Sequence, residues 1–152
     1  MAHYRGTVES TRSHEQTFAY MAEFANVREW DPTAAEARAL EEGEPGLGSR
    51  FFVRVHWLGR DLPLTYEIVE FEPPHRLVLR AENESSVSED TVEVTANGDG
   101  ATLIYDARVT LKGIGRFADP LLGLAFKRLG DNAAAGLRRE LGAPSPSQGA
   151  GR

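Results

Sequence analysis

The sequence predicts an α+β fold in which helices cover one face of an antiparallel sheet. Two observations lead to this class. Apolar residues recur at helical spacing near both ends of the chain, whereas between these regions they alternate with polar residues in a series of short segments. Turn-forming residues separate the alternating segments, so consecutive strands are expected to pair antiparallel rather than through the long crossovers of a parallel sheet.

Length and composition fit one globular domain. The chain has 152 residues, of which 41% are hydrophobic and 26% are charged. A chain of this length can bury a sizeable core without disulfides or metal. Residues 142–152 are rich in Gly, Ser, Pro and Ala and have nothing to pack, so we predict a disordered tail after a domain of residues 1–141.

Charge and hydropathy restrict the partners and the location. The net charge of −6 argues against the basic patch that nucleic-acid binding requires. The chain lacks the run of roughly 18 apolar residues needed to cross a bilayer, and its first residues lack the apolar stretch of a secretion signal. We therefore expect a cytoplasmic protein with no nucleic-acid partner and no stable membrane insertion. The sequence leaves the oligomeric state open.

A short helical region precedes the alternating segments. Apolar residues in Ser13–Phe24 recur at helical spacing, with Ser13 as the N-cap and Gln16 as its capping-box partner. Residues Asn26–Trp30 can add one more turn. Asp31 and Pro32 end it, because a residue that precedes proline is disfavoured in the helical conformation.

A long helix is predicted at the C-terminal end, over Phe117–Leu141. Gly130 and Gly136 each cost about 1 kcal/mol relative to alanine in a helix interior. Close approach of another segment, or room for a ligand, must offset that cost. The apolar stripe of this helix consists of Leu121, Leu122, Ala125, Leu129, Ala133 and Leu137.

Seven segments are predicted as strands, one before the short helical region and six after it. Turns are expected at Leu58–Asp61, Glu72–His75 and Asn97–Gly100, where Gly, Pro, Asn and Asp gather. The predicted strands are Tyr4–Glu9, Ala34–Leu40, Phe51–Trp57, Leu64–Val69, Leu77–Glu82, Ser88–Ala96 and Leu103–Leu111.

Several strings of the sequence are similar to one known superfamily. They are Phe18–Tyr20 with Asn26 and Trp30, Gly46–Phe51, Tyr66–Pro74, Arg76–Leu79, and Leu111–Gly113 followed by Ala118–Leu122. With the order of elements from Val8 to Leu141, these strings resemble the START-like (SRPBCC, helix-grip) superfamily and, within it, the polyketide cyclase/dehydrase and lipid-transport group. The resemblance implies a helix-grip fold: a seven-stranded antiparallel β-sheet wrapped around a long C-terminal α-helix, with one or two short helices between strands 1 and 2. It also implies a ligand cavity between the sheet and the last helix.

Strand alternation then predicts which side chains face that cavity. Residues at every second position along a strand share one face, and the apolar set is expected to face inward while the charged set, including Asp106, faces solvent. The polar members of the inward set are Tyr66, Tyr105, Ser88 and Asp90. Together with the helix stripe, this predicts a ligand-binding site formed by Trp30, Phe51, Val55, Trp57, Tyr66, Leu79, Asp90, Tyr105, Leu121, Ala125 and Leu129.

Asp90 is the candidate for acid–base chemistry. A buried, unpaired carboxyl has a raised pKa, which a general acid or base needs. Alternatively, Asp90 lies near the sheet end, where Arg116, Arg128 or water neutralises its charge. The four His residues lack the spacing of metal ligands, so we expect no metal and no cofactor.

Three functions remain open at this stage. The favoured one is the binding of a small hydrophobic molecule, such as a lipid, a polyketide or an aromatic metabolite, between the sheet and the last helix. The alternative is a polyketide aromatase/cyclase or dehydratase, which acts on a poly-β-ketone in the same cavity. Such chemistry requires orientation and one acid or base, so a missing catalytic motif does not exclude it. A third is a protein-binding domain whose cavity is filled by side chains.

Overall fold

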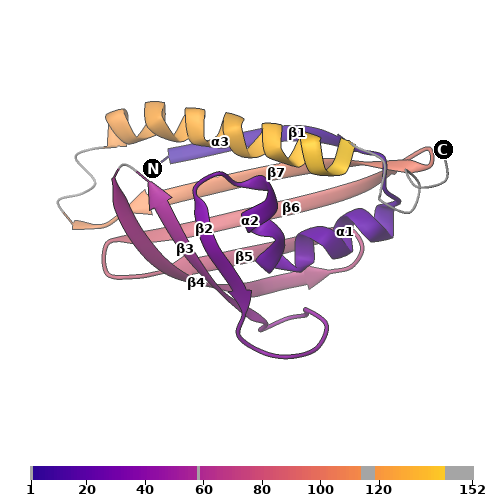
Figure 1. Cartoon of the computed structure of the whole chain (residues 1–152), viewed down its shortest axis with the longest axis horizontal. Coiled ribbons are helices and arrows are strands. Elements are labelled where there is room, and N and C mark those ends of the chain that lie inside the picture. Colours follow the sequence, from indigo (N-terminus) through magenta and orange to yellow (C-terminus); the bar gives the residue numbers. More distant parts are fainter. Residues whose placement is uncertain (1, 58, 114–118, 143–152) are drawn as a thin grey trace.

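The chain forms one curved sheet with its helices on a single face (Figure 1). The computed structural model describes residues 2–57, 59–113 and 119–142, with side chains in the last segment described from Gly123 onward. In chain order the elements are β1 (Ala2–Ser10), α1 (His14–Ala22), the 3₁₀ turn η1 (Phe24–Asn26), α2 (Val27–Trp30), β2 (Ala34–Ala39), β3 (Arg50–Trp57), β4 (Arg60–Glu72), β5 (Arg76–Glu82), β6 (Ser86–Asn97), β7 (Gly100–Leu111) and α3 (Asp119–Gly142).

The seven strands are ordered β1-β7-β6-β5-β4-β3-β2, and every neighbouring pair is antiparallel. Strands β2 to β7 therefore form a continuous meander, and β1 closes the far edge against β7. Register shifts between Ile68 and Glu70 in β4, and between Ala34 and Glu36 in β2, mark bulges, which bend a sheet locally. The predicted α+β helix-grip fold is confirmed.

Strand β4 is much longer than the predicted Leu64–Val69. It begins at Arg60, and Arg60 and Asp61, predicted as part of a turn, pair with Trp57 and His56 of β3. The chain reverses more tightly than a four-residue turn would, with Gly59 at a φ of 74°, so these two residues join the strand. Pro63 lies inside the strand, opposite Arg54.

The short helical region begins as predicted and then divides. The Ser13 hydroxyl accepts a hydrogen bond from the Gln16 backbone N–H at 3.1 Å, and the Gln16 side chain accepts one from the Ser13 N–H at 3.2 Å, which completes the capping box. Helix α1 ends at Ala22, two residues before the predicted Phe24, and α2 ends at Trp30 as expected.

Helix α3 runs along the concave side of the sheet, close to β1 (Figure 1). Its predicted first residues, 117 and 118, and most of the predicted tail, residues 143–152, lie outside the described residues. The C-terminal end of α3 is fixed to the segment around β1. The Thr11 backbone N–H donates to the Leu141 carbonyl at 2.8 Å, and the Arg138 guanidinium donates to the Thr7 carbonyl at 3.0 Å.

Two glycines let α3 lie this close to the rest of the molecule. A Cβ at Gly136 would overlap the backbone carbonyl of Trp30 in α2, and a Cβ at Gly130 would overlap the ring of Tyr4 in β1. The close approach predicted to offset the cost of these glycines is therefore present. It brings the backbone of α3 directly against the backbone of α2.

The hydrophobic core occupies one half of the space beneath α3. Phe18, Met21 and Trp30 from the helical region belong there to the same buried cluster as Leu137 and Leu141 in the C-terminal half of α3, which are fully buried. In the N-terminal half of α3, by contrast, Leu124 is 73% exposed and Ala125 and Leu129 are only partly covered, while Phe126 is buried. None of the helices in the described part of the chain is long and apolar enough to span a membrane.

The outer face of the sheet is charged, as predicted, with one exception. Asp106, expected to be solvated, is buried among His3, Arg5 and Arg108, whose nitrogens lie 2.8, 3.5 and 3.2 Å from its carboxylate oxygens. Burial opposes ionisation, but hydrogen bonds from His3 and Arg108 hold the pKa of Asp106 below its usual value. The expectation failed because alternation assigns a face but not the partners that cover it.

Replacing Gly136 by alanine should destabilise the protein. The new methyl group meets backbone, which cannot rotate away, and overpacking of this kind costs typically 1–3 kcal/mol. Gly123→Ala is the matched control, because no atom lies near a Cβ at that position of the same helix and alanine is favoured there by up to about 1 kcal/mol. Urea unfolding of both variants measures the effect. Equal midpoints for the two variants would contradict the contact.

Candidate functional site

A cavity of about 830 Å³ lies between the sheet and the N-terminal half of α3. The helix faces it with small side chains, Ala125, Gly130 and Ala133, which leave unfilled the space that the curved sheet encloses. This volume is in the range of roughly 300–1,000 Å³ that small-molecule sites occupy. The apolar wall consists of Val55, Trp57, Leu62, Leu64, Ala107, Val109, Leu111, Ala125, Phe126 and Leu129.

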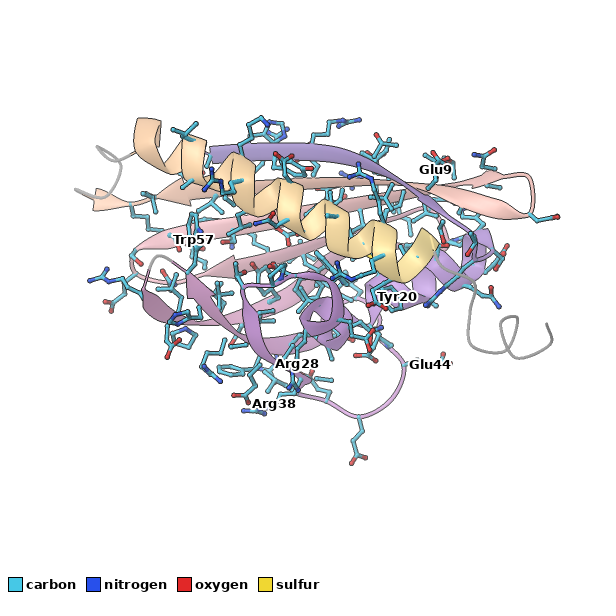
Figure 2. The ribbon with its side chains drawn as sticks, turned by 45° about the horizontal axis from the view of Figure 1, so that its top comes forward. Glu9, Tyr20, Arg28, Arg38, Glu44 and Trp57 are labelled. Atoms are coloured by element: carbon cyan, nitrogen blue, oxygen red, sulfur yellow. The ribbon has the colours of Figure 1, made fainter. Side chains whose placement is uncertain are left out.

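Aromatic side chains close part of this wall. Trp57, at the end of β3, lies beneath the first described turns of α3 (Figure 2), where its ring meets that of Phe126 edge to face with centroids 6.3 Å apart. Leu129 follows Phe126 by three residues, so both side chains lie on the same face of the helix. An aromatic and aliphatic surface of this kind favours contact with an apolar ligand.

Five polar residues gather at the inner end of the cavity, and we call them the polar cluster. They come from four segments: the residue after α2, and strands β4, β6 and β7. The polar cluster consists of Asp31, Tyr66, Ser88, Asp90 and Tyr105.

Asp90 and Tyr105 form the central contact of the polar cluster. The Tyr105 hydroxyl donates a hydrogen bond to Asp90 Oδ2 at 2.6 Å. The register of β6 and β7 explains this contact, because Asp90 pairs with Ala107, two residues from Tyr105, and diagonal neighbours on one face of a sheet lie within reach of long side chains. The Trp30 ring packs edge to face on the Tyr105 ring, with centroids 5.3 Å apart, and so restricts the position of the Tyr105 side chain.

Asp90 ionises with difficulty. Its exposed fraction is 6%, and loss of solvation raises its pKa to about 7, although the hydrogen bond from Tyr105 opposes the shift. The negative charges of Asp31, Asp106 and Glu89 contribute to the same shift. No cationic side chain in the described part of the chain offsets them. Asp90 therefore exists in both protonation states near neutral pH.

Asp31 is the second carboxyl of the polar cluster. One of its oxygens, Oδ1, accepts hydrogen bonds from the Thr33 backbone N–H at 2.9 Å and from the Thr33 hydroxyl at 2.8 Å. Desolvation raises the pKa of Asp31 in spite of these bonds. Burial also raises the pKa values of Tyr66 and Tyr105 well above normal, so both phenols stay protonated.

The opposite end of the cavity is its mouth. It is formed by Arg60 at the start of β4, by the turn Asn83–Ser86, and by Lys112 and Gly113 after β7. These chain segments gather at the left-hand end of the molecule in Figure 1. The Lys112 ammonium donates to Glu82 Oε2 at 2.5 Å and to the Asn83 carbonyl at 3.0 Å, which holds the turn against β7.

The structure brings most of the predicted site residues together. Val55, Trp57, Tyr66, Asp90, Tyr105, Ala125 and Leu129 line the cavity. Trp30, Phe51 and Leu79 are fully buried in the core and do not belong to the described lining, while the side chain of Leu121 lies outside the described residues. Alternation identifies inward-facing positions, but it does not separate the half of the sheet under the core from the half under the cavity.

Sequence reasoning missed Asp31, Thr33 and Phe126. Asp31 was interpreted only as the residue that ends a helix, and nothing in the local sequence indicates that its carboxyl reaches the cavity. Of the two arginines considered as partners of Asp90, Arg128 is exposed on α3 and Arg116 lies outside the described residues. Among the described residues, no group of three or more His, Asp or Glu side chains has an arrangement that could hold a metal ion.

Comparison with known proteins agrees with this architecture. A family model described as polyketide cyclase/dehydrase and lipid transport matches residues 1–142. No curated protein matches the sequence.

Solved structures with low sequence identity share the fold. A START superfamily protein from Mycobacterium smegmatis is 17% identical with a TM-score of 0.75, and the match covers 93% of this chain and 98% of that one. A protein from Thermus thermophilus is 13% identical with a TM-score of 0.77, covering 94% and 99%. The Zhui aromatase/cyclase from a Streptomyces species is 13% identical with a TM-score of 0.73, covering 92% and 93%.

The raised pKa of Asp90 predicts a pH dependence of stability. Between about pH 4 and pH 7 the folded state holds the Asp90 proton while the unfolded chain has lost it, so the free energy of unfolding falls as pH rises. For one titrating group, the free energy of unfolding changes by at most about 1.4 kcal/mol per pH unit. Asp90→Asn should lose the contribution of Asp90 to this slope and keep that of Asp31, so between pH 4 and pH 8 its free energy of unfolding should fall less than that of wild type.

Denaturant unfolding of wild type and Asp90→Asn across this pH range is the measurement. Glu89→Gln is the matched control, since it removes a charge one residue away on the exposed outer face. Because Glu89 is only a minor cause of the raised pKa of Asp90, this variant should keep most of the wild-type slope. Parallel pH profiles for wild type and Asp90→Asn would show that Asp90 ionises as readily in the folded protein as in the unfolded chain.

Proposed function

Because this chain belongs to the polyketide cyclase/dehydrase and lipid-transport family, we propose that it binds a small hydrophobic molecule in the cavity between the sheet and α3. The observation that carries the proposal is the cavity itself, about 830 Å³ in volume, with an apolar wall and a polar cluster at its inner end. Sites for small molecules combine these two features, since the apolar wall supplies affinity and the few polar groups fix orientation.

The polar cluster supports one orientation of the ligand. Apolar atoms would contact Trp57, Phe126 and Leu129, and one polar group would reach Asp90 and Tyr105. Lipids, polyketides and aromatic metabolites all fit this description. A hydrogen bond from such a group to the polar cluster would contribute about 0.5–1.5 kcal/mol, so most of the affinity would come from the apolar contacts.

Filling the cavity should abolish binding without unfolding the protein. Ala125 lines the cavity and Leu124 is 73% exposed on the same turn of α3. Ala125→Trp should therefore prevent uptake of the neutral fluorescent probe N-phenyl-1-naphthylamine, whereas Leu124→Trp should not. Probe titration and thermal unfolding of both variants provide the measurement.

The same experiment separates a cavity from an ordinary core. A tightly packed core would lose typically 1–3 kcal/mol when tryptophan is inserted, while an open cavity accepts the added volume. Unchanged probe binding by Ala125→Trp, together with a large loss of stability, would contradict the proposal. Native mass spectrometry of the purified protein would identify any molecule that it retains.

A second candidate function is the cyclisation or dehydration of a poly-β-ketone in the same cavity. The observation that favours it is Asp90, a buried carboxyl with a pKa of about 7, hydrogen-bonded to Tyr105. A carboxyl of that pKa can accept a proton from a carbon between two carbonyls and return it to the alkoxide formed on ring closure. The fold shared with the Zhui aromatase/cyclase supports this possibility without identifying a substrate.

Turnover of a reactive poly-ketone analogue distinguishes the two functions. For an enzyme, Asp90→Asn should lower the rate by roughly 10²–10⁴-fold while the dissociation constant of a stable analogue changes little. For a binding protein, wild type and Asp90→Asn should convert the analogue at the same background rate. A collapse of turnover at unchanged affinity would establish catalysis by Asp90 and overturn the pure binding function.

A further inference from the structure

The charged groups of the cavity are separated along its length. Among the described lining residues, the polar cluster at the inner end contains two carboxyls, Asp31 and Asp90, whereas the mouth holds the cations Arg60 and Lys112 together with the acid Glu84. Lys112 is already neutralised by its ion pair with Glu82. The inner end thus holds acidic groups without a basic one.

The cations lie too far away to neutralise the inner end. Arg60 is six residues from Tyr66 along β4, and Lys112 is seven residues from Tyr105 along β7 and its extension. At about 3.3 Å per residue, each separation is roughly 20 Å. At that separation neither cation reaches ion-pair distance of the inner carboxyls, and the charges that shift the pKa of Asp90 are those of Asp31, Asp106 and Glu89.

Every element around Asp90 contributes either an acid, a hydroxyl or an apolar group. Asp31 faces it from beyond α2, Tyr66 from β4 and Tyr105 from β7, while Ser88 precedes it on β6. The wall that α3 places over the cavity contains no titratable side chain among its described residues, which are Ala125, Phe126, Leu129, Gly130 and Ala133. Glu89 and Asp106 add negative charge from the other side of the sheet.

This arrangement favours ligands whose polar group donates hydrogen bonds over ligands whose polar group is negatively charged. A hydroxyl or ammonium group can donate to the carboxylate oxygens of Asp90 and Asp31, and the Tyr105 hydroxyl is already engaged as a donor to Asp90. A carboxylate at the same place would meet two acids and no cation among the described lining residues. It would lose its hydration without gaining a charged partner, which is costly in a buried site.

We propose that the polar cluster makes the cavity selective for apolar ligands whose buried end carries a hydroxyl or amino group, and excludes those with a carboxylate there. This selectivity rests on the proposed binding function and specifies the chemical class of its ligand. Free fatty acids and aromatic acids are excluded at the inner end, while aromatic or aliphatic alcohols and amines are accepted.

The selectivity for amines should increase with pH. An ammonium ligand pairs with ionised Asp90, and Asp90 becomes ionised as the pH rises through about 7. Binding and proton release are then coupled, so amine affinity should increase by up to about tenfold per pH unit below that point and level off above it. A neutral alcohol should show a much weaker pH dependence.

Three ligands of the same apolar body test the proposal: 2-naphthol, 2-naphthylmethylamine and 2-naphthoate. Each is titrated against wild-type protein loaded with N-phenyl-1-naphthylamine at pH 8, and displacement of the probe is measured. The alcohol and the amine should displace the probe, and the carboxylate should bind at least about tenfold more weakly than either. Naphthoate that binds as tightly as naphthol would overturn the selectivity while leaving the binding function intact.

Variants locate the selectivity in the polar cluster. Asp90→Asn should reduce the affinity ratio of amine to carboxylate by at least about tenfold and remove the pH dependence of amine binding. Glu89→Gln, which changes the same charge on the outer face, should keep the wild-type ratio. An unchanged ratio in Asp90→Asn would overturn the role of Asp90, and failure of the neutral probe itself to bind wild type would overturn the binding function and the selectivity together.

Discussion

The backbone contact between Gly136 of α3 and the Trp30 carbonyl of α2 is the constraint on which the rest of the site depends. It sets the distance of α3 from the helical region and holds Trp30 against the ring of Tyr105. Tyr105 in turn donates to Asp90. A helix contact in the core is thereby connected, through two aromatic side chains, to the ionisable group at the inner end of the cavity.

The two buried aspartates of neighbouring strands illustrate how partners determine charge. Asp90 and Asp106 have the same exposed fraction, 6%, yet the pKa of Asp90 is raised and that of Asp106 is lowered. Asp106 lies on the outer face beside His3 and Arg108, which stabilise its carboxylate. Asp90 has one neutral hydroxyl and several negative neighbours. The fold therefore favours the charged form of the carboxylate outside the sheet and disfavours the charged form of the one inside it.

Helix α3 performs two tasks along its length. Its C-terminal half, with Leu137 and Leu141, completes the core and is held by hydrogen bonds from Thr11 and Arg138. Its N-terminal half covers the cavity with Ala125, Phe126 and Leu129. Because stability comes from one half, the other half can leave space for a ligand. The cavity and the contacts that stabilise the fold thus lie at different ends of α3.

The sequence by itself determined the class of fold, the order of the elements and the inward face of each strand. Alternation, capping at Ser13 and the turn residues act over a few positions, so they can be interpreted without knowing the tertiary structure. These local signals correctly assigned Tyr66, Asp90 and Tyr105 to the interior. They failed at the start of β4, where Arg60 and Asp61, predicted as part of a turn, are paired strand residues.

Only the tertiary structure decided which interior residues form core and which form cavity. Trp30, Phe51 and Leu79 were predicted to face inward like the lining residues, but they lie under the half of the sheet that the core covers. Tertiary structure also brought Asp31, from the end of a helix, to within electrostatic reach of Asp90. The physical reason is that burial and pKa depend on groups distant in sequence, whose positions are fixed when α3 packs against Trp30 through Gly136.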